Sequence, residues 1–300
     1  MADERSSRTA QLDPPILAAV DGSTSSYAAV AWAAVDATLH HRKLHLLTSM
    51  AIETRLGPGP MLSEADVEWL RREAERIVAE ATRVARTAAP GGDLTITTEI
   101  TSGLVIPTLI ERSAEVRMLV VGSRGIGAFQ RGLLGSVSTA VTRHAHCPVA
   151  VIHDISAVDP VSASRPVLVG VDGTDNSVPA IELAFEEASR RKVGLVALHA
   201  WSDTSGLDLP ITGWETAQQS EQALLAEGLA GWSERYPDVE VRRIVVTDRP
   251  VHSLLEESDN AQLLIVGSHG RGGFNSMLLG STSNALLHAA EVPMIVVRAH

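Results

Sequence analysis

Short apolar runs alternate with longer amphipathic stretches along the whole chain. In the first half, four apolar runs and one alternating segment predict strands, at residues 16–20, 44–48, 94–100, 118–121 and 149–152. The stretches between them predict helices, at residues 25–40, 63–89, 104–114 and 137–144. Ser23 can cap the first helix, and Pro90-Gly91-Gly92 ends the second. Because strands that alternate with helices pair in parallel through right-handed crossovers, the pattern predicts a doubly wound, Rossmann-like α/β sheet.

The second half of the chain repeats the first. Val20-Asp21-Gly22-Ser23 recurs as Val171-Asp172-Gly173-Thr174. The apolar run that ends in Gly-Ser at residues 119–123 recurs at 264–268. A repeat this long indicates domain duplication rather than a solenoid. We therefore expect two tandem five-stranded domains, with these boundaries: a flexible N-terminus at 1–12, domain one at 13–154, a Ser/Ala/Pro linker at 155–165 and domain two at 166–300.

Composition excludes several classes of protein. A net charge of −11 without a cluster of Lys and Arg argues against nucleic acid and against an anionic membrane surface. No apolar stretch reaches the roughly 18 residues of a membrane span, and residues 1–11 lack the apolar core of a secretory signal. With Cys147 as the only cysteine, we expect a cytoplasmic protein.

A glycine-rich loop occurs at the same place in both copies. Gly122-Ser123-Arg124-Gly125 follows the fourth strand, and after nine residues Gly135-Ser136 begins a helix. The second copy has Gly267-Ser268-His269-Gly270 and, after nine residues, Gly280-Ser281. Glycines allow the backbone to approach a phosphate, and a helix start offers unpaired N–H groups. Ser136, Ser138, Ser281 and Ser283 could add hydroxyl donors. One such loop is weak support for phosphate binding, but the long spacing and its repetition favour it, although neither loop has the Gly-Lys-Ser/Thr of a Walker A loop.

An aspartate ends the first strand of each copy. If that strand lies beside the fourth, Asp21 faces Gly122, and Asp172 faces Gly267. Each carboxylate could accept hydrogen bonds from ribose hydroxyls or help to hold a Mg²⁺ ion that bridges phosphates. Asp21 could instead be a plain helix N-cap.

These two motifs, each matched twice, resemble those of the universal stress proteins, in the ATP-binding, tandem two-domain form common in actinobacteria. The resemblance covers both copies almost end to end. It implies the strand order 3-2-1-4-5, one ATP per domain and a homodimer formed through strand five.

The resemblance also implies which residues contact ATP. Nucleoside contacts would fall on Ala19, Val20, Asp21 and Ser49 in the first copy, and on Gly170, Val171, Asp172 and Ala200 in the second. Phosphate contacts would fall on Gly122, Gly125, Gly135, Ser136 and Ser138, and on Gly267, Gly270, Gly280, Ser281 and Ser283. Val137 and Thr282 complete the two sets, and Arg124 and His269 would touch a terminal phosphate or face solvent.

The copies differ near the expected nucleoside. Ala19 stands where the second copy has the more usual Gly170, and Leu47-Thr48-Ser49 stands where it has Leu198-His199-Ala200. We expect these changes to reshape the first pocket, and so to give two sites of unequal affinity.

Three functions fit the sequence. The first is an ATP-dependent regulator of stress adaptation or growth that acts on an unidentified protein partner. The second is an enzyme, either a weak ATPase or a phosphoryl or adenylyl transferase, and the third is an interaction module that binds no nucleotide. The chain shows no evident general base or transfer-substrate site, so the regulator is preferred. His144, His146 and Cys147 do not have the spacing of a closed metal site, and no metal ligand is predicted.

Overall fold

A computed structural model of the chain describes residues 13–51, 63–91, 93–125, 134–153, 160–201, 214–247, 249–270 and 279–298. Contacts divide the chain into two compact units, unit one (Met1–Ile152) and unit two (His153–His300), each holding one copy of the repeat. Residues 1–12, expected to form a flexible N-terminus, lie outside the described residues, as do 126–133 and 271–278 in the two glycine loops.

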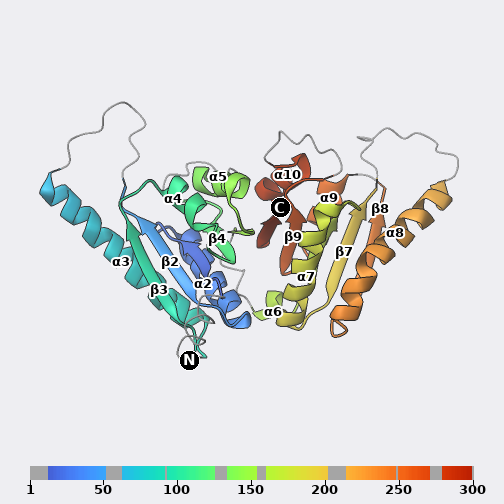
Figure 1. Cartoon of the computed structure of the whole chain (residues 1–300), viewed down its shortest axis with the longest axis horizontal. Coiled ribbons are helices and arrows are strands. Elements are labelled where there is room, and N and C mark those ends of the chain that lie inside the picture. The colour runs from blue at the N-terminus through green and yellow to red at the C-terminus, as the bar shows by residue number, and fades with distance from the viewer. Residues whose placement is uncertain are drawn as a thin grey trace, which may run out of the picture. The chain divides into compact units, whose positions relative to one another are not determined.

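Unit one is a parallel sheet with helices on both faces (Figure 1). Its strands are β1 (Ile16–Ala19), β2 (Leu44–Ser49), β3 (Ile96–Thr101), β4 (Met118–Gly122) and β5 (Val149–Ile152). Strand pairing gives the order β3-β2-β1-β4-β5, which confirms the expected 3-2-1-4-5 arrangement. β1 therefore lies beside β4 at the centre of the unit.

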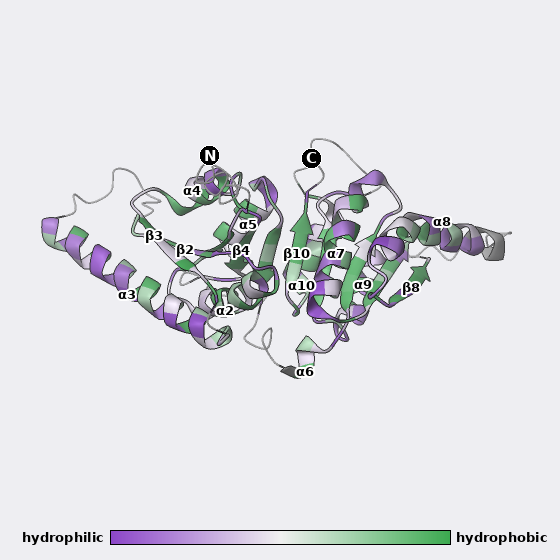
Figure 2. Cartoon of the chain, turned by 60° about the horizontal axis from the view of Figure 1, so that its bottom comes forward, coloured by the Kyte–Doolittle hydropathy of each residue, from purple (hydrophilic) through white to green (hydrophobic). Residues whose placement is uncertain are grey.

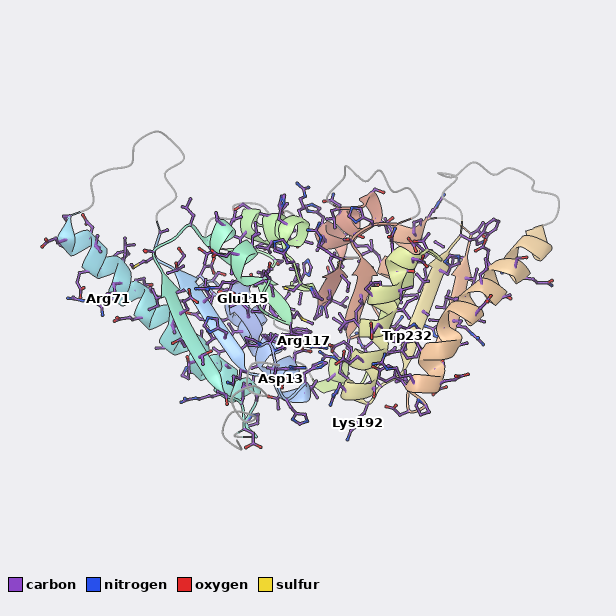
Figure 3. All side chains as sticks on the ribbon, in the orientation of Figure 1. Asp13, Arg71, Glu115, Arg117, Lys192 and Trp232 are labelled. Atoms are coloured by element: carbon purple, nitrogen blue, oxygen red, sulfur yellow. The ribbon has the colours of Figure 1, made fainter. Side chains whose placement is uncertain are left out.

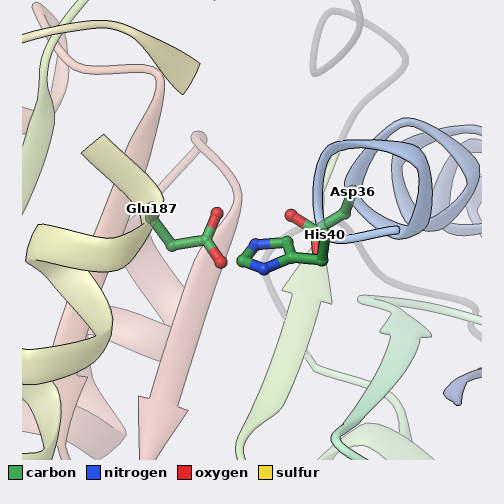
Figure 4. A group of neighbouring side chains, drawn as sticks. All are labelled: Asp36, His40 and Glu187. Carbon is green, nitrogen blue, oxygen red and sulfur yellow. The ribbon is translucent and has the colours of Figure 1, made fainter. Parts of the chain in front are cut away.

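Two helices cover each face of this sheet. α2 (Thr24–Leu39) and α3 (Glu64–Ala88) pack together on one face, and α4 (Val105–Arg112) and α5 (Ser136–His144) pack together on the other (Figure 1). α2 is rich in buried alanines, which let it pack closely on the strands. It ends with the N–H of His40 donating to Asp36 O over 3.0 Å; both residues are drawn in Figure 4. None of the described helices combines the length and apolar composition that crossing a bilayer requires.

α3 has one buried face and one charged face. Its buried residues recur every three or four positions, at Ala74, Ile77, Val78, Ala81 and Ala85. Its outer face is hydrophilic (Figure 2) and carries an Arg72–Glu68 ion pair, 3.0 Å between Nε and Oε1. Arg71, which points away from the sheet in Figure 3, pairs with Glu75 in the same way. This face is a solvated surface held by pairs one turn apart.

Unit two repeats the arrangement. Its strands are β6 (Val167–Val171), β7 (Leu195–Ala200), β8 (Val241–Val246), β9 (Leu263–Gly267) and β10 (Met294–Val297), paired in the order β8-β7-β6-β9-β10. Its main helices are α7 (Val178–Arg191), α8 (Trp214–Arg235), α9 (Pro250–Ser258) and α10 (Ser281–Ala289).

Two short elements of unit two were not predicted. A 3-10 turn, η2 (Asp175–Ser177), precedes α7, whereas α2 begins directly as an α-helix. A four-residue helix, α6 (Pro160–Ala163), lies within the segment expected to be an irregular linker. Both are too short to leave a periodic pattern in the sequence.

Candidate functional site

The end of β1 meets the start of the glycine loop in unit one. The pairing of Ile16 with Met118 and of Ala18 with Val120 brings the carboxyl ends of β1 and β4 to one edge of the sheet. Asp21 follows β1, and its Oδ2 lies directly where a side chain on Gly125 would begin. In unit two a Cβ on Gly270 would lie 3.6 Å from Asp172 Oδ2. Each predicted aspartate therefore faces the predicted loop of its own unit, but at its second glycine, Gly125 or Gly270; the nearest neighbour of the expected Gly122 is Ser25.

The backbone of the following turn holds each carboxylate in place. Asp21 Oδ1 accepts from the N–H of Ser23 over 3.0 Å, and Asp172 Oδ1 accepts from the N–H of Thr174 over 2.8 Å. The residue between them is a glycine with positive φ, +87° at Gly22 and +76° at Gly173, which other residues rarely adopt. This requirement explains why Asp-Gly occurs in both copies.

The interpretation of Asp21 as a helix N-cap is wrong. The N-cap of α2 is Ser23, whose hydroxyl accepts from the N–H of Ser26 over 3.2 Å. Because Ser23 serves the helix end, the Asp21 carboxylate is directed to the edge of the sheet, as a ligand-binding group should be.

The other end of each glycine loop leads into a helix. Gly135 is the N-cap of α5 and Gly280 the N-cap of α10, and neither helix start has a side-chain cap. The N–H of Gly135 donates to Ser123 O over 2.8 Å, and that of Gly280 donates to Ser268 O over 2.7 Å. These bonds hold the helix start beside the start of the loop. The N–H groups of the first helical turn and the positive end of the helix dipole thus lie beside the start of the loop, whose second glycine faces the aspartate.

The predicted serines of this helix start have different roles. Ser138 and Ser283 are buried, and each hydroxyl donates to a carbonyl at the start of its loop, Gly122 O or Gly267 O, over 2.6 Å. In this arrangement their hydroxyl hydrogens tie the helix to the strand end rather than facing a phosphate. Ser136 and Ser281 are exposed at the helix start, where a phosphate would lie.

The sequence difference between Ala19 and Gly170 has a packing explanation. A Cβ on Gly170 would lie 3.2 Å from Leu254 Cδ1 and 3.2 Å from Val266 Cγ1, tighter than most real contacts. The missing side chain therefore gives room to α9 and β9 of the core. The contrast was expected to reshape the nucleoside pocket, but the described contacts connect it with helix packing.

The ends of the second strands of the two units, β2 and β7, make different hydrogen bonds, through Ser49 and His199. Ser49 Oγ donates to Gly103 O over 2.7 Å, so it holds the connection between β3 and α4. In unit two the buried His199 places Nδ1 2.8 Å from Val171 O and Nε2 2.8 Å from Glu221 Oε2 of α8. His199 thus joins the residue before Asp172 to α8, a role that the sequence did not reveal.

The residues after the first loop glycine also differ between the units. Ser268 Oγ lies 2.9 Å from Nδ1 of His269. In unit one the corresponding Ser123 hydroxyl is buried and has no hydrogen-bond partner among the residues that the structure describes. The backbone of Arg124 is instead bonded to Ser25 of α2, which sequence reasoning missed because the two residues are far apart in the chain.

Burial differs within the cluster of His144, His146 and Cys147. His144 ends α5 and is exposed, as is His146, whereas Cys147 is buried. Burial raises the pKa of the Cys147 thiol to about 12. The thiol therefore lies inside the fold, whereas both imidazoles face its surface.

Comparison with known proteins agrees with the duplication of the chain. A family profile described as "Universal stress protein family" matches residues 14–153 and again 163–298. The chain belongs to the universal stress protein family. The universal stress protein Rv2005c of Mycobacterium tuberculosis is 48% identical over 285 residues, which cover 94% of this chain and 96% of the relative. The universal stress protein Rv2623 of the same organism is 42% identical over 284 residues, with the same coverage of both chains.

A solved structure supports the fold of this universal stress protein. The crystal structure of a universal stress protein from Archaeoglobus fulgidus DSM 4304 superposes with a TM-score of 0.69 at 22% identity, covering 95% of this chain and 98% of that one. The tandem organisation and the Rossmann-like α/β fold are thereby shown. Each unit combines a fixed carboxylate with a glycine loop and an uncapped helix start, an arrangement that can accept from sugar hydroxyls and donate to phosphate.

Proposed function

We propose that this universal stress protein binds ATP in each unit and that nucleotide occupancy regulates its action in the cytoplasmic stress response. The observation that carries the proposal is the pairing, in both units, of an aspartate at the end of the first strand with a glycine loop that leads into an uncapped helix. Asp21 or Asp172 would accept from ribose, and the loop and helix N–H groups would hold the phosphates. A Mg²⁺ ion that accompanies ATP would be held mainly by phosphate oxygens and water, its usual mode.

The proposal concerns a regulator rather than an enzyme. The carboxylates of Asp21 and Asp172 are both bonded to backbone N–H groups, which suits holding a ligand more than moving a proton. Binding of ATP to the folded chain would change the population of states that a protein partner recognises. The proposed partner is a protein that recognises one of these states.

The test measures nucleotide directly. Purified protein is denatured and the released nucleotide identified, and the nucleotide-free protein is then titrated with ATP, ADP, AMP and cyclic AMP. Binding of ATP to the native state should stabilise it by about 2.7 kcal/mol at a hundredfold excess over Kd. Protein that releases no nucleotide and takes up none would refute the proposal.

Matched variants assign binding to the site. Asp21→Ala together with Asp172→Ala should remove the stabilisation by ATP. Asp93→Ala is the control, because Asp93 is exposed at the amino end of β3, away from the candidate site. Stabilisation that survives the double substitution would place nucleotide elsewhere.

A further inference from the structure

In unit one, the first turn of α2 is tied to the start of the glycine loop. Ser25 Oγ donates to Arg124 O over 2.5 Å and accepts from the N–H of Arg124 over 3.2 Å. The Ser23 hydroxyl lies 3.4 Å from the same carbonyl. One side chain of α2 therefore engages both polar groups of the Arg124 backbone, including an N–H that would otherwise face a phosphate.

Unit two has a different arrangement at the same positions. Asn176 of η2 stands in the place of Ser25, and its backbone carbonyl lies 3.2 Å from where a Cβ on Gly267 would lie, a contact that the Ser25 carbonyl also makes, more closely, with Gly122. The hydroxyl of Thr174, the counterpart of Ser23, lies 2.9 Å from each oxygen of Asp172. The Thr174 hydroxyl thus lies against Asp172, whereas the Ser23 and Ser25 hydroxyls of unit one lie against the carbonyl of Arg124 in the loop.

The distance between the aspartate and the loop also differs between the two units. In unit one, Asp21 Oδ2 occupies the position that a Gly125 Cβ would need, whereas in unit two the corresponding separation is 3.6 Å. A ribose hydroxyl that donates to Asp21 must approach within about 3 Å of the carboxylate oxygen. In unit one, Gly125 lies against the Asp21 carboxylate on this side, and the Ser25 bonds to the adjacent Arg124 hold it there.

We propose that Ser25 is a positioning residue that holds the unit-one loop against Asp21 and lowers the ATP affinity of site one, so that unit two binds ATP first. The inference rests on the proposed ATP function and adds the order in which the sites fill. Binding at site one exchanges the Ser25–Arg124 hydrogen bonds for bonds from Arg124 and its neighbours to phosphate. Site two has Asn176 in place of this serine, so the exchange of a serine hydroxyl for phosphate does not arise there.

The test uses the full chain with one site disabled. Asp172→Ala leaves site one and Asp21→Ala leaves site two, and calorimetric titration with ATP gives each Kd. We expect the weaker Kd at site one. Adding Ser25→Ala to Asp172→Ala should strengthen binding at site one by about threefold to tenfold, the range that corresponds to one hydrogen bond.

Two control variants separate this role from general damage to the helix. Ser25→Thr keeps the hydroxyl and should retain the weaker affinity, while Thr24→Ala removes an exposed hydroxyl from the neighbouring residue and should leave the Kd unchanged. Ser25→Ala in the Asp21→Ala chain should not alter site two.

Three outcomes would overturn the inference. They are equal affinities in the two single-site chains, a lower Kd at site one than at site two, or a Ser25→Ala chain that binds ATP no better than its parent. Even if Ser25→Ala fails to fold, equal affinities in the two single-site chains would still overturn the inference. If neither chain binds any nucleotide, the proposed function fails as well, whereas ATP binding at site two with no effect of Ser25 refutes only the inference.

Discussion

Gly122, the last residue of β4, lies against the backbone of Ser25 in the first turn of α2. A Cβ built on Gly122 would lie 2.7 Å from both the carbonyl carbon and the oxygen of Ser25. At the corresponding place in unit two, a Cβ on Gly267 would lie 3.2 Å from Asn176 O. The glycine that opens each loop therefore has a structural role, the close approach of the following helix, and this approach is tighter in unit one.

Gly122→Ala should destabilise the protein more than Gly267→Ala does. The new methyl group would overlap backbone atoms in unit one, which costs about 1–3 kcal/mol in a packed site, whereas in unit two a small shift would relieve the contact. Urea unfolding measures both changes. Gly91→Ala, where nothing lies within 4 Å of the new atom, is the control and should be neutral. Equal destabilisation by the two loop substitutions would contradict the difference in packing.

Glu99 should stabilise unit one at neutral pH but not in acid. Burial opposes its ionisation, but Arg112, at 2.9 Å, and His45, at 3.2 Å, together outweigh burial and hold the pKa of Glu99 below its ordinary value. A lowered pKa stabilises the folded state above the unfolded pKa of about 4.3, and the effect is lost as the pH falls through the folded pKa.

Glu99→Gln should therefore lower the free energy of unfolding by about 0.5–1 kcal/mol at pH 7, since the ion pair is partly exposed. The difference from the parent should shrink as the pH falls below about 4. Unfolding curves at several pH values measure it, with Glu234→Gln, an exposed glutamate of unit two, as the control. A difference that stays constant down to acid pH would show that the charge of Glu99 is not the cause.

Cys147 should be unreactive in the folded protein. Its thiol is buried and its pKa is raised to about 12, so almost no thiolate exists at pH 8. Iodoacetamide should modify Cys147 of the native chain only as fast as the chain unfolds. In urea it should modify Cys147 at once. Ser102→Cys, which places a thiol at an exposed position, gives the rate for an accessible group when combined with Cys147→Ala. Rapid alkylation of Cys147 in the native chain would contradict its burial.

Association through strand five stays a prediction. The resemblance to the family implies it, and within unit one β5 pairs with β4 and is the last strand of the order. Sedimentation velocity with and without ATP should show a species of twice the 31.8-kDa chain. A single-chain mass at every concentration tested, with ATP present, would rule out the homodimer.

The sequence predicted most of the architecture because its signals are local. The buried run at Val149–Ile152 was predicted with its exact bounds, and the helix expected at 63–89 was observed at Glu64–Ala88. Short apolar strands that alternate with helices along a chain form a parallel sheet. The duplication also predicted that Asp21 and Gly122, and Asp172 and Gly267, would form equivalent sites.

By itself, therefore, the sequence determined the two units, their strands and main helices and the residue types of both candidate sites. Only the tertiary structure decided which of those groups are already engaged: Ser138 with Gly122 O, and Ser25 with the backbone of Arg124, 99 residues away. It also placed His199 between Val171 and Glu221 and related Gly170 to the packing of α9. The physical reason is that periodicity and capping depend on neighbours in the chain, whereas these contacts exist only once the sheet has brought separate segments to one edge.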